Sequence, residues 1–385
     1  MKKLFSRMDK PLLITMIIFS ILGLVMVFSA SSVSAVLRYG VSSYYFFLRQ
    51  LVFFTISYAV GLIIVIRFPT SKYKFLTPFL VVGVIAALAG LFMYGFIAGG
   101  AQSWYSLGFF NLQPLEFAKA IMIVYMAVFY SRTQKKKNAK PLTYLIPLAV
   151  GFVITMLVAM QPDLGGAIII AAITFLTFLA VPLPNKSKQM VIRVLVVGVF
   201  ILIAGLLITG KTLFTSNQLS RFEFRNPCSR YTQTTGYQVC NGYIAIHNGG
   251  LFGVGLGNST QKYLYLPEAH TDFIFPIIVE ELGAIVGILV LLGYAFMLYR
   301  IIKIAKQSEN LRCSILAYGT ALLLLAHILV NLLGVLALIP LTGVPLPLLS
   351  YGGSFNMPVI IMLFVVQRVA IENSINKSKR EIASI

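Results

Sequence analysis

The sequence predicts an all-α protein that crosses a membrane many times. Of its 385 residues, 58% are hydrophobic and only 11% are charged, whereas soluble domains carry about 25% charged residues. The mean hydropathy is +0.89, and apolar runs of about 20 residues, the length that crosses a bilayer core, recur along the chain. This composition excludes a disordered chain, a coiled coil and a small secreted domain held by disulfides.

Ten apolar segments predict ten transmembrane helices. They cover residues 12–31, 46–66, 75–96, 115–130, 142–160, 164–181, 190–210, 273–299, 313–339 and 351–371. Residues 211–272 form one large loop between the seventh and eighth segments. Because such long loops are uncommon unless functional or disordered, and this one is not low in complexity, we expect a folded cap. No internal repeat is visible, and we expect residues 1–385 to form a single membrane domain.

The distribution of basic residues predicts the topology. Most of the 31 Lys and Arg residues lie at the amino terminus, in alternate gaps and in the carboxy-terminal tail. Because basic residues favour the cytoplasmic side, we expect both termini in the cytoplasm and the large loop outside. The net charge of +20 then reflects topology and contact with anionic lipid, and no nucleic-acid partner is expected.

The first segment and the cysteines each leave an alternative. Residues 1–35 resemble a signal peptide, but their apolar run of about 20 residues exceeds the 7–15 of a cleaved signal, so we expect a retained first helix. Cys228 and Cys240 share the large loop, where an oxidising environment permits a disulfide. The sequence leaves their pairing open.

Several of the eleven acidic residues lie where a charge is costly, which makes each a functional hypothesis. Glu116 and Lys119 are spaced to pair on one helix face, as a structural ion pair or a substrate contact. Gln113 precedes that helix. Asp163, in a tight turn before the sixth segment, is expected to cap the next helix rather than to catalyse. Four acids at cytoplasmic edges are expected to be solvated: Asp9, Glu309, Glu372 and Glu381.

The strongest candidate site is Glu268-Ala269-His270-Thr271-Asp272, where the large loop re-enters the membrane before an apolar Phe-Ile-Phe run. A partly desolvated carboxylate there has a raised pKa and can act as a general base, so we predict Asp272 in that role. His270 would orient it or share its proton. The Glu-x-His-x-Asp pattern also contains metal-ligand types, which leaves a metal site open.

The glycine run at residues 249–257 contains G-x-G spacings but has no preceding strand or ribose-binding acid. Close backbone packing, or amides that face an anion, suits it better than a dinucleotide. The sequence has no Walker A motif, so we expect no nucleotide cofactor.

Seven motifs spread over nearly the whole chain resemble those of the SEDS family (shape, elongation, division and sporulation). They lie at residues 100–104, 113–119, 161–165, 256–262, 266–275, 280–283 and 345–354. The Leu-Gly-Asn-Ser-Thr-Gln-Lys run at 256–262 looks more like the division and sporulation branch than the elongation branch. The resemblance implies ten transmembrane helices, and the family's catalytic acid falls on Asp272.

The resemblance also implies a function and partners. It indicates a peptidoglycan glycosyltransferase that polymerises lipid II at the outer face of the bacterial cytoplasmic membrane, with undecaprenyl diphosphate as the leaving group. Implied partners are a class B penicillin-binding protein and other division or elongation proteins. A divalent cation, Mg or Mn, is implied as well, although the sequence does not identify its ligands.

The expected substrate-binding residues lie in these motifs and on the outer side: Arg49, Trp104, Gln113, Glu116, Lys119, Asp163, Arg221, Glu268, His270, Ser350, Gly352, Gly353 and Ser354. The cations Arg49, Lys119 and Arg221 are candidates to neutralise the diphosphate. Two rival functions are a lipid II flippase and a non-enzymatic division scaffold. The ionisable cluster at the outer edge favours polymerisation over flipping, and the acids at membrane depth count against a scaffold.

Overall fold

The computed structural model describes residues 2–98, 101–108, 110–135, 140–183, 188–194, 196–198 and 224–383. Within these ranges, eight helices are long and apolar enough to cross a membrane. They are α2 (Lys10–Leu37), α3 (Tyr45–Val60, extended by a π-helical turn at Gly61–Val65), α4 (Tyr73–Tyr94), α5 (Pro114–Thr133), α6 (Ile146–Ala159, preceded by a 3-10 turn at Pro141–Leu145), α11 (Ile274–Lys306), α12 (Leu311–Val335) and α13 (Gly353–Ala383).

The described residues also include α1 (Lys2–Phe5), the short apolar α7 (Leu164–Ala180), α10 (Thr234–Gly249) and helical residues at 188–194 and 196–198. Helix α7 corresponds to the predicted sixth segment. The predicted seventh segment, residues 190–210, and the start of the large loop lie mostly outside the described residues. The chain is therefore a mostly helical, multi-pass membrane protein.

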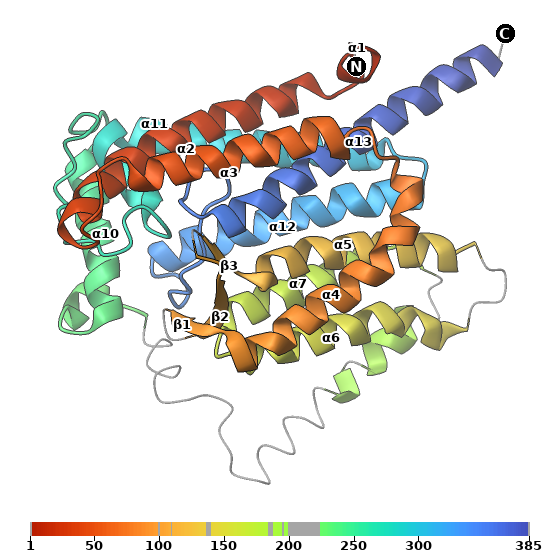
Figure 1. Ribbon diagram of the computed structural model, residues 1–385, viewed down its shortest axis with the longest axis horizontal. Coiled ribbons are helices and arrows are strands. Elements are labelled where there is room, and N and C mark those ends of the chain that lie inside the picture. Colours follow the sequence, from red (N-terminus) through yellow and green to blue (C-terminus); the bar gives the residue numbers. More distant parts are fainter. Residues whose placement is uncertain are drawn as a thin grey trace.

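The helices pack side by side, and both chain ends lie at one end of the bundle, away from α10 (Figure 1). Helices α12 and α13 run between α2 and α3 on one side and α5 to α7 on the other. Helix α13 is the most buried span, whereas α3 and α4 expose most of their apolar side chains. Small residues permit the close contacts: a Cβ on Gly61 would lie 2.0 Å from the Phe364 ring.

A small sheet corrects the expectation of an all-α chain. Strands β1 (Phe96–Ala98), β2 (Ala101–Ser106) and β3 (Asn111–Leu112) pair antiparallel in the order β1-β2-β3, between α4 and α5. The Tyr105 hydroxyl anchors this sheet by donating to the Ala87 carbonyl of α4 over 2.7 Å. Pairing of the strands satisfies backbone groups that a loose linker beside the bundle would leave unpaired.

The glycine run packs against a break in α11. Gly283 has φ of 89°, which interrupts the helix. The Val254 N–H donates to the Glu280 carbonyl over 2.9 Å, and the Ala284 N–H donates to the Gly250 carbonyl over 2.9 Å. The glycine run thus replaces hydrogen bonds that the broken turn of α11 lacks. The prediction of close backbone packing is confirmed.

The prediction that four acids are solvated is wrong for Asp9 and Glu372. Asp9 caps α2 by accepting from the Leu12 N–H over 3.0 Å, and it also pairs with Arg300. Glu372 accepts from the Thr70 N–H over 2.8 Å and is mostly buried. These two acids have partners because tertiary packing brings donors from other segments next to them. Glu309 and Glu381 are exposed, as expected.

Cys228 and Cys240 form a disulfide, which the sequence left open. Cys240 lies within α10, and Cys228 lies in a short 3-10 turn at Pro227–Arg230. Their Cα atoms are 4.9 Å apart. The bond ties the chain segment before α10 to the helix itself.

Candidate active site

Asp272 lies directly before α11, at the end of the bundle away from the chain termini. It is 7% exposed, and its backbone carbonyl accepts from the Asn331 side-chain amide of α12 over 2.7 Å. The same amide donates to the Val344 carbonyl over 2.7 Å. A Cβ on Gly343 would lie 3.7 Å from Asp272 Oδ2. The carboxylate therefore faces the irregular segment between α12 and α13.

The Asp272 carboxylate has no Lys or Arg partner among the described residues. The Thr271 hydroxyl lies between two acids, 3.1 Å from Asp272 Oδ1 and 3.0 Å from Glu268 Oε2. Burial, with a smaller contribution from the negative charge of Glu268, raises the pKa of Asp272 to about 7. A carboxyl with that pKa is partly ionised at neutral pH, as a general base requires.

Glu268 and His270 have different surroundings. The Glu268 side chain is 38% exposed and lies 3.7 Å from the Arg38 guanidinium. The His270 ring is buried between Phe46 and Tyr351, with centroid distances of 4.7 and 5.6 Å. Burial, followed by the positive charge of Arg38, lowers the pKa of His270 to about 4, so its ring is neutral at pH 7.

Arg49 joins this cluster from α3. Its guanidinium lies over the Tyr45 ring at 4.5 Å, and its positive charge counters the burial that raises the pKa of Tyr351. The Tyr351 N–H donates to the His270 carbonyl over 2.8 Å. Arg49 and His270, which are far apart in sequence, therefore meet at Tyr351. By contrast, Arg221 lies outside the described residues.

A second polar cluster lies inside the bundle. Lys119 Nζ is 2.7 Å from Glu116 Oε1, which confirms their pairing, and 3.0 Å from His327 Nε2 of α12. His327 and Asn331 are one turn apart on α12 and face the same side. Neither residue was predicted as functional from the sequence, although two polar side chains four residues apart in an apolar span indicate a shared polar site.

The predicted cap and its neighbours hold the start of α7. Asp163 Oδ1 accepts from the Gly166 N–H over 2.8 Å, which confirms the capping prediction. Gln113 Nε2 lies 3.4 Å from Asp163 Oδ2. Trp104 is half-buried in β2, paired with Phe96 of β1. Gln113 and Asp163 thus bring the starts of α5 and α7 together, whereas Trp104 lies within the sheet.

The Ser-Tyr-Gly-Gly-Ser run at 350–354 makes close contacts between α13 and α3. Ser350 Oγ accepts from the Leu346 N–H over 2.8 Å. The Gly352 N–H donates to the Gln50 side chain over 3.1 Å, and a Cβ on Gly353 would lie 2.3 Å from the Phe53 ring. Ser354 donates to the Asn111 carbonyl of β3. Three of these four predicted substrate-binding residues have structural partners through side-chain or backbone groups, and Gly353 has no room for a side chain.

Two buried acids of α11 fasten the loop that precedes this helix. Lys262 Nζ lies 2.9 Å from Glu281 Oε1, and both side chains are almost fully buried. Glu280 has no cationic partner among the described residues. Its carboxylate accepts instead from side-chain and backbone donors of the loop: Asn248, Ser259, Thr260 and Gln261. This network fixes the loop that leads to Asp272.

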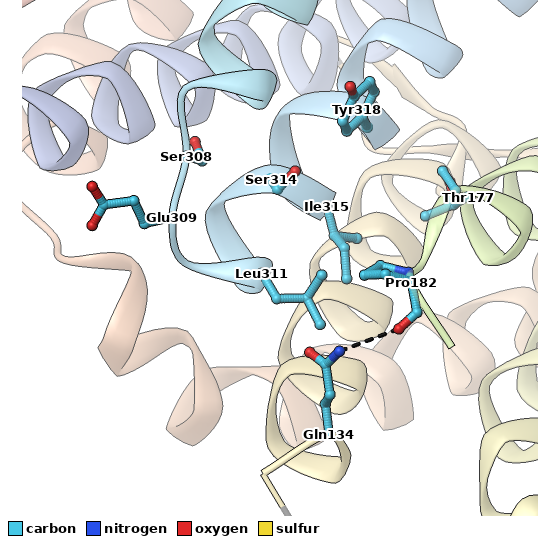
Figure 2. A pocket seen from close by; sticks show the side chains of 10 residues that line it. Gln134, Thr177, Pro182, Ser308, Glu309, Leu311, Ser314, Ile315 and Tyr318 are labelled. Atoms are coloured by element: carbon cyan, nitrogen blue, oxygen red, sulfur yellow. Dashed lines mark hydrogen bonds between the residues drawn. The ribbon is translucent and has the colours of Figure 1, made fainter. Parts of the chain in front are cut away.

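A pocket of about 390 Å³ lies at the other end of the bundle, between the ends of α5 and α7 and the start of α12. Figure 2 shows the Glu309 carboxylate pointing away from the other labelled side chains, toward the outside of this pocket. Glu309 is paired with Arg380 at 2.7 Å. None of the predicted site residues lines this pocket, so its chemistry is separate from that of Asp272.

The residues near Asp272 fit a shared cation better than a closed metal site. Within the described ranges, no three His, Cys, Asp or Glu side chains gather as ligands. Mg²⁺ commonly binds one or two carboxylates together with substrate phosphates and water. The half-exposed Glu268 carboxylate can supply one such ligand beside a diphosphate.

Fold and site together define a class of protein: a polytopic membrane protein in which a buried acid, Asp272, has no cationic partner among the described residues and lies where a long loop meets a span. The sequence profile of the FtsW, RodA and SpoVE family, described as "Cell cycle protein", matches residues 9–375. The chain belongs to this family.

Its relatives cover almost the full length. It is 38% identical to the "Probable peptidoglycan glycosyltransferase FtsW" of Bacillus subtilis strain 168, over 99% of this chain and 95% of the relative. It is 34% identical to "Stage V sporulation protein E" of the same organism, over 90% of this chain and 92% of the relative.

Two solved structures share the fold at 24% identity. The crystal structure of the Thermus thermophilus rod shape determining protein RodA has a TM-score of 0.65, with 94% of this chain and 96% of that chain covered. A chain of "Structural coordination of polymerization and crosslinking by a peptidoglycan synthase complex" has a TM-score of 0.71, with 95% and 98% covered.

Proposed function

We propose that this chain is a peptidoglycan glycosyltransferase that polymerises lipid II into glycan strands, with Asp272 as the general base. The observation that carries the proposal is the Asp272 carboxylate itself, which is buried, has no described cationic partner and has a pKa of about 7. The full-length relatives named as peptidoglycan glycosyltransferases support the substrate class.

The reaction needs one base. The acceptor hydroxyl oxygen forms a bond to the anomeric carbon of the donor sugar as its proton passes to Asp272. The bond from that carbon to the diphosphate breaks, and its electron pair leaves with undecaprenyl diphosphate. Because the diphosphate already carries charge, the second carboxylate of a glycosidase pair is not required.

Cations would stabilise the leaving group. Among the three candidate cations, Arg49 adjoins the His270 region through Tyr351, and we assign it to the diphosphate ahead of Lys119, which is already paired with Glu116. Arg221 stays a proposed contact. A divalent cation, Mg or Mn, would be held by Glu268 and the diphosphate oxygens, and would neutralise charge there.

The depth of Asp272 supports a lipid-linked substrate. Its carbonyl is held by Asn331, nineteen residues after Arg312 along α12, a rise of about 29 Å. The hydrocarbon core is about 30 Å thick. Arg312, at the basic end of the span, would thus lie at one boundary and Asp272 at the other, where the diphosphate of a lipid substrate also lies.

The topology proposed with this function has ten spans, with α7 and segment 190–210 added to the eight candidate spans. Both termini are cytoplasmic, and loop 211–272 caps the outer face. The structural relative from a peptidoglycan synthase complex supports a class B penicillin-binding protein as the partner. The FtsW and sporulation relatives favour a role with other division proteins.

The test is glycan synthesis by the purified protein in detergent with lipid II. Asp272→Asn should reduce the rate at least about 100-fold, the usual contribution of a general base. Glu309→Gln, an exposed acid at the opposite end, should retain the rate and serves as the control. Normal synthesis by a folded Asp272→Asn variant would refute the base assignment. Leaflet exchange in vesicles without synthesis would favour the flippase, for which the buried Glu116–Lys119 pair is the motivating observation.

A further inference from the structure

Residues 251–256 of the outer loop form an apolar surface that no described part of the chain covers. Phe252 is 82% exposed, Leu251 64% and Leu256 55%. No Asp, Glu, Lys or Arg occurs from residue 248 to 261. Exposed apolar patches outside the spans are unusual and mark a binding surface.

The backbone of this segment is paired in a way that suits lipid. Val254 and Gly255 donate to the Glu280 and Glu281 carbonyls over 2.9 and 3.0 Å, and the Leu251 carbonyl accepts from Ile285 over 3.3 Å. The Asn258 side chain donates to the Val254 carbonyl over 3.1 Å. Irregular backbone is tolerated at membrane depth only where its polar groups find protein partners. In residues 251–256, the N–H groups of Val254 and Gly255 and the carbonyls of Leu251 and Val254 have such partners.

Two helices place the segment at the outer boundary of the hydrocarbon core. Ala284, whose N–H binds the Gly250 carbonyl, lies nineteen residues before Lys303 on the part of α11 that follows the break, a rise of about 29 Å. The Ser29 hydroxyl, 2.7 Å from the Glu281 carboxylate, lies nineteen residues after Lys10 on α2, about 29 Å. Both distances match the roughly 30 Å of a bilayer core.

The surface is also continuous with a lipid-facing stripe. Ile285 is 43% exposed, and Ile288 and Leu292, one and two turns further along α11, are 57% and 58% exposed. Because the Leu251 carbonyl binds Ile285, loop and stripe adjoin. Tyr263 and Tyr265, more than half exposed nearby in the chain, are the residue type that gathers at membrane interfaces.

We propose that residues 251–256 insert into the outer leaflet and bind its acyl chains through Leu251, Phe252 and Leu256. The insertion would fix the outer loop, and Asp272 beyond it, at a set height relative to the lipid. It goes beyond the proposed glycosyltransferase activity and does not depend on it.

Depth-dependent fluorescence quenching tests the insertion. The protein is reconstituted alone in vesicles of phosphatidylcholine and phosphatidylglycerol. Because the chain already has one Trp, Trp104, the fluorescence of the parent protein is subtracted from that of Phe252→Trp. Lipids brominated on the acyl chains should remove about half of that difference signal, with bromines near the carbonyls most effective, as for side chains buried about 5–10 Å.

Tyr231→Trp is the matched control, because Tyr231 is 43% exposed on the same outer loop but outside the apolar surface. Iodide present on both sides of the vesicles should quench the control and spare Phe252→Trp. If iodide quenches Phe252→Trp and brominated lipids do not, the segment faces water and the insertion is refuted. The apolar surface would then belong to a protein partner. If Phe252→Trp fails to fold, Leu251→Trp provides the same comparison.

Discussion

The ion pair between Lys262 and Glu281 is the clearest place to measure what fastens the outer loop to the membrane bundle. We predict that Lys262→Met, which keeps the length and apolar stem of the side chain, strongly destabilises the protein. Both partners are buried, with side chains 4% and 0% exposed, and their charged atoms are 2.9 Å apart. Removal of the lysine leaves a buried carboxylate without its cation.

The magnitude follows from the remaining partners. Breaking a buried pair from one side costs about 3–5 kcal/mol. Glu281 would keep the Ser29 hydroxyl at 2.7 Å and the Ser259 N–H at 3.4 Å, so we expect about 3 kcal/mol, the lower end. The double variant Lys262→Met/Glu281→Gln has no unpaired charge and should cost much less than the two single changes added together.

Unfolding in detergent, followed by fluorescence against temperature or denaturant, measures these differences for the two single variants and the double variant. Lys377→Met is the control, because Lys377 is 81% exposed and 3.9 Å from Glu381, and should change stability by less than about 0.5 kcal/mol. A Lys262→Met cost equal to that of the control, or strictly additive single changes, would show that this pair does not hold the loop.

Three further predictions concern Asp272 and the α11 break. The polymerisation rate should rise with pH through about 7, because the pKa of Asp272 is raised to about 7. Glu268→Gln removes a negative charge that raises this pKa, so it should move the rise to lower pH in a pH–rate profile. An unmoved profile would show that the Glu268 charge does not act on Asp272. Burying an ionised Asp272 costs on the order of 2–4 kcal/mol of stability above pH 7 and nothing below its unfolded pKa near 4. Asp272→Asn should therefore stabilise the protein by that amount at pH 8, seen as a higher melting temperature, and not at pH 4; equal melting shifts at both pH values would contradict this. Gly283→Ala should cost at least about 2 kcal/mol of stability, because φ is 89° and the new Cβ would lie 2.2 Å from the Leu251 carbonyl oxygen. Gly83→Ala is the control, because a Cβ on Gly83 of α4 meets nothing within 4 Å. Equal melting temperatures for the two Ala variants would disprove the strain.

Much of the fold could be predicted from apolar run lengths. The fourth segment, expected over 115–130, is α5 at Pro114–Thr133, and the ninth, expected over 313–339, is α12 at Leu311–Val335. The strands between α4 and α5 were not predicted, because three strands of two to six residues carry too little alternation to stand out. The break at Gly283 was also missed, since a glycine inside an apolar run gives no sign of φ above zero.

The site was only partly predictable. Asp272 was predicted because a charged group beside an apolar run costs free energy and therefore indicates a function. The structure confirms that its carboxylate is buried. Asn331 did not stand out, because its contact with the Asp272 carbonyl joins residues 59 positions apart. Ser350 was expected to bind substrate, yet its hydroxyl is bonded to the Leu346 N–H, a local contact that residue type alone does not reveal.

The sequence by itself determined that this is a membrane protein, the position of most apolar helices and the acid that precedes the apolar start of α11. These depend on composition and on the number of residues that cross a bilayer. Only the tertiary structure decided which polar groups are paired. Lys262 neutralises Glu281 while Asp272 is left without a described cation, because pairing depends on helix register and on a loop bonded into the broken turn of α11. No single segment encodes such contacts between distant residues.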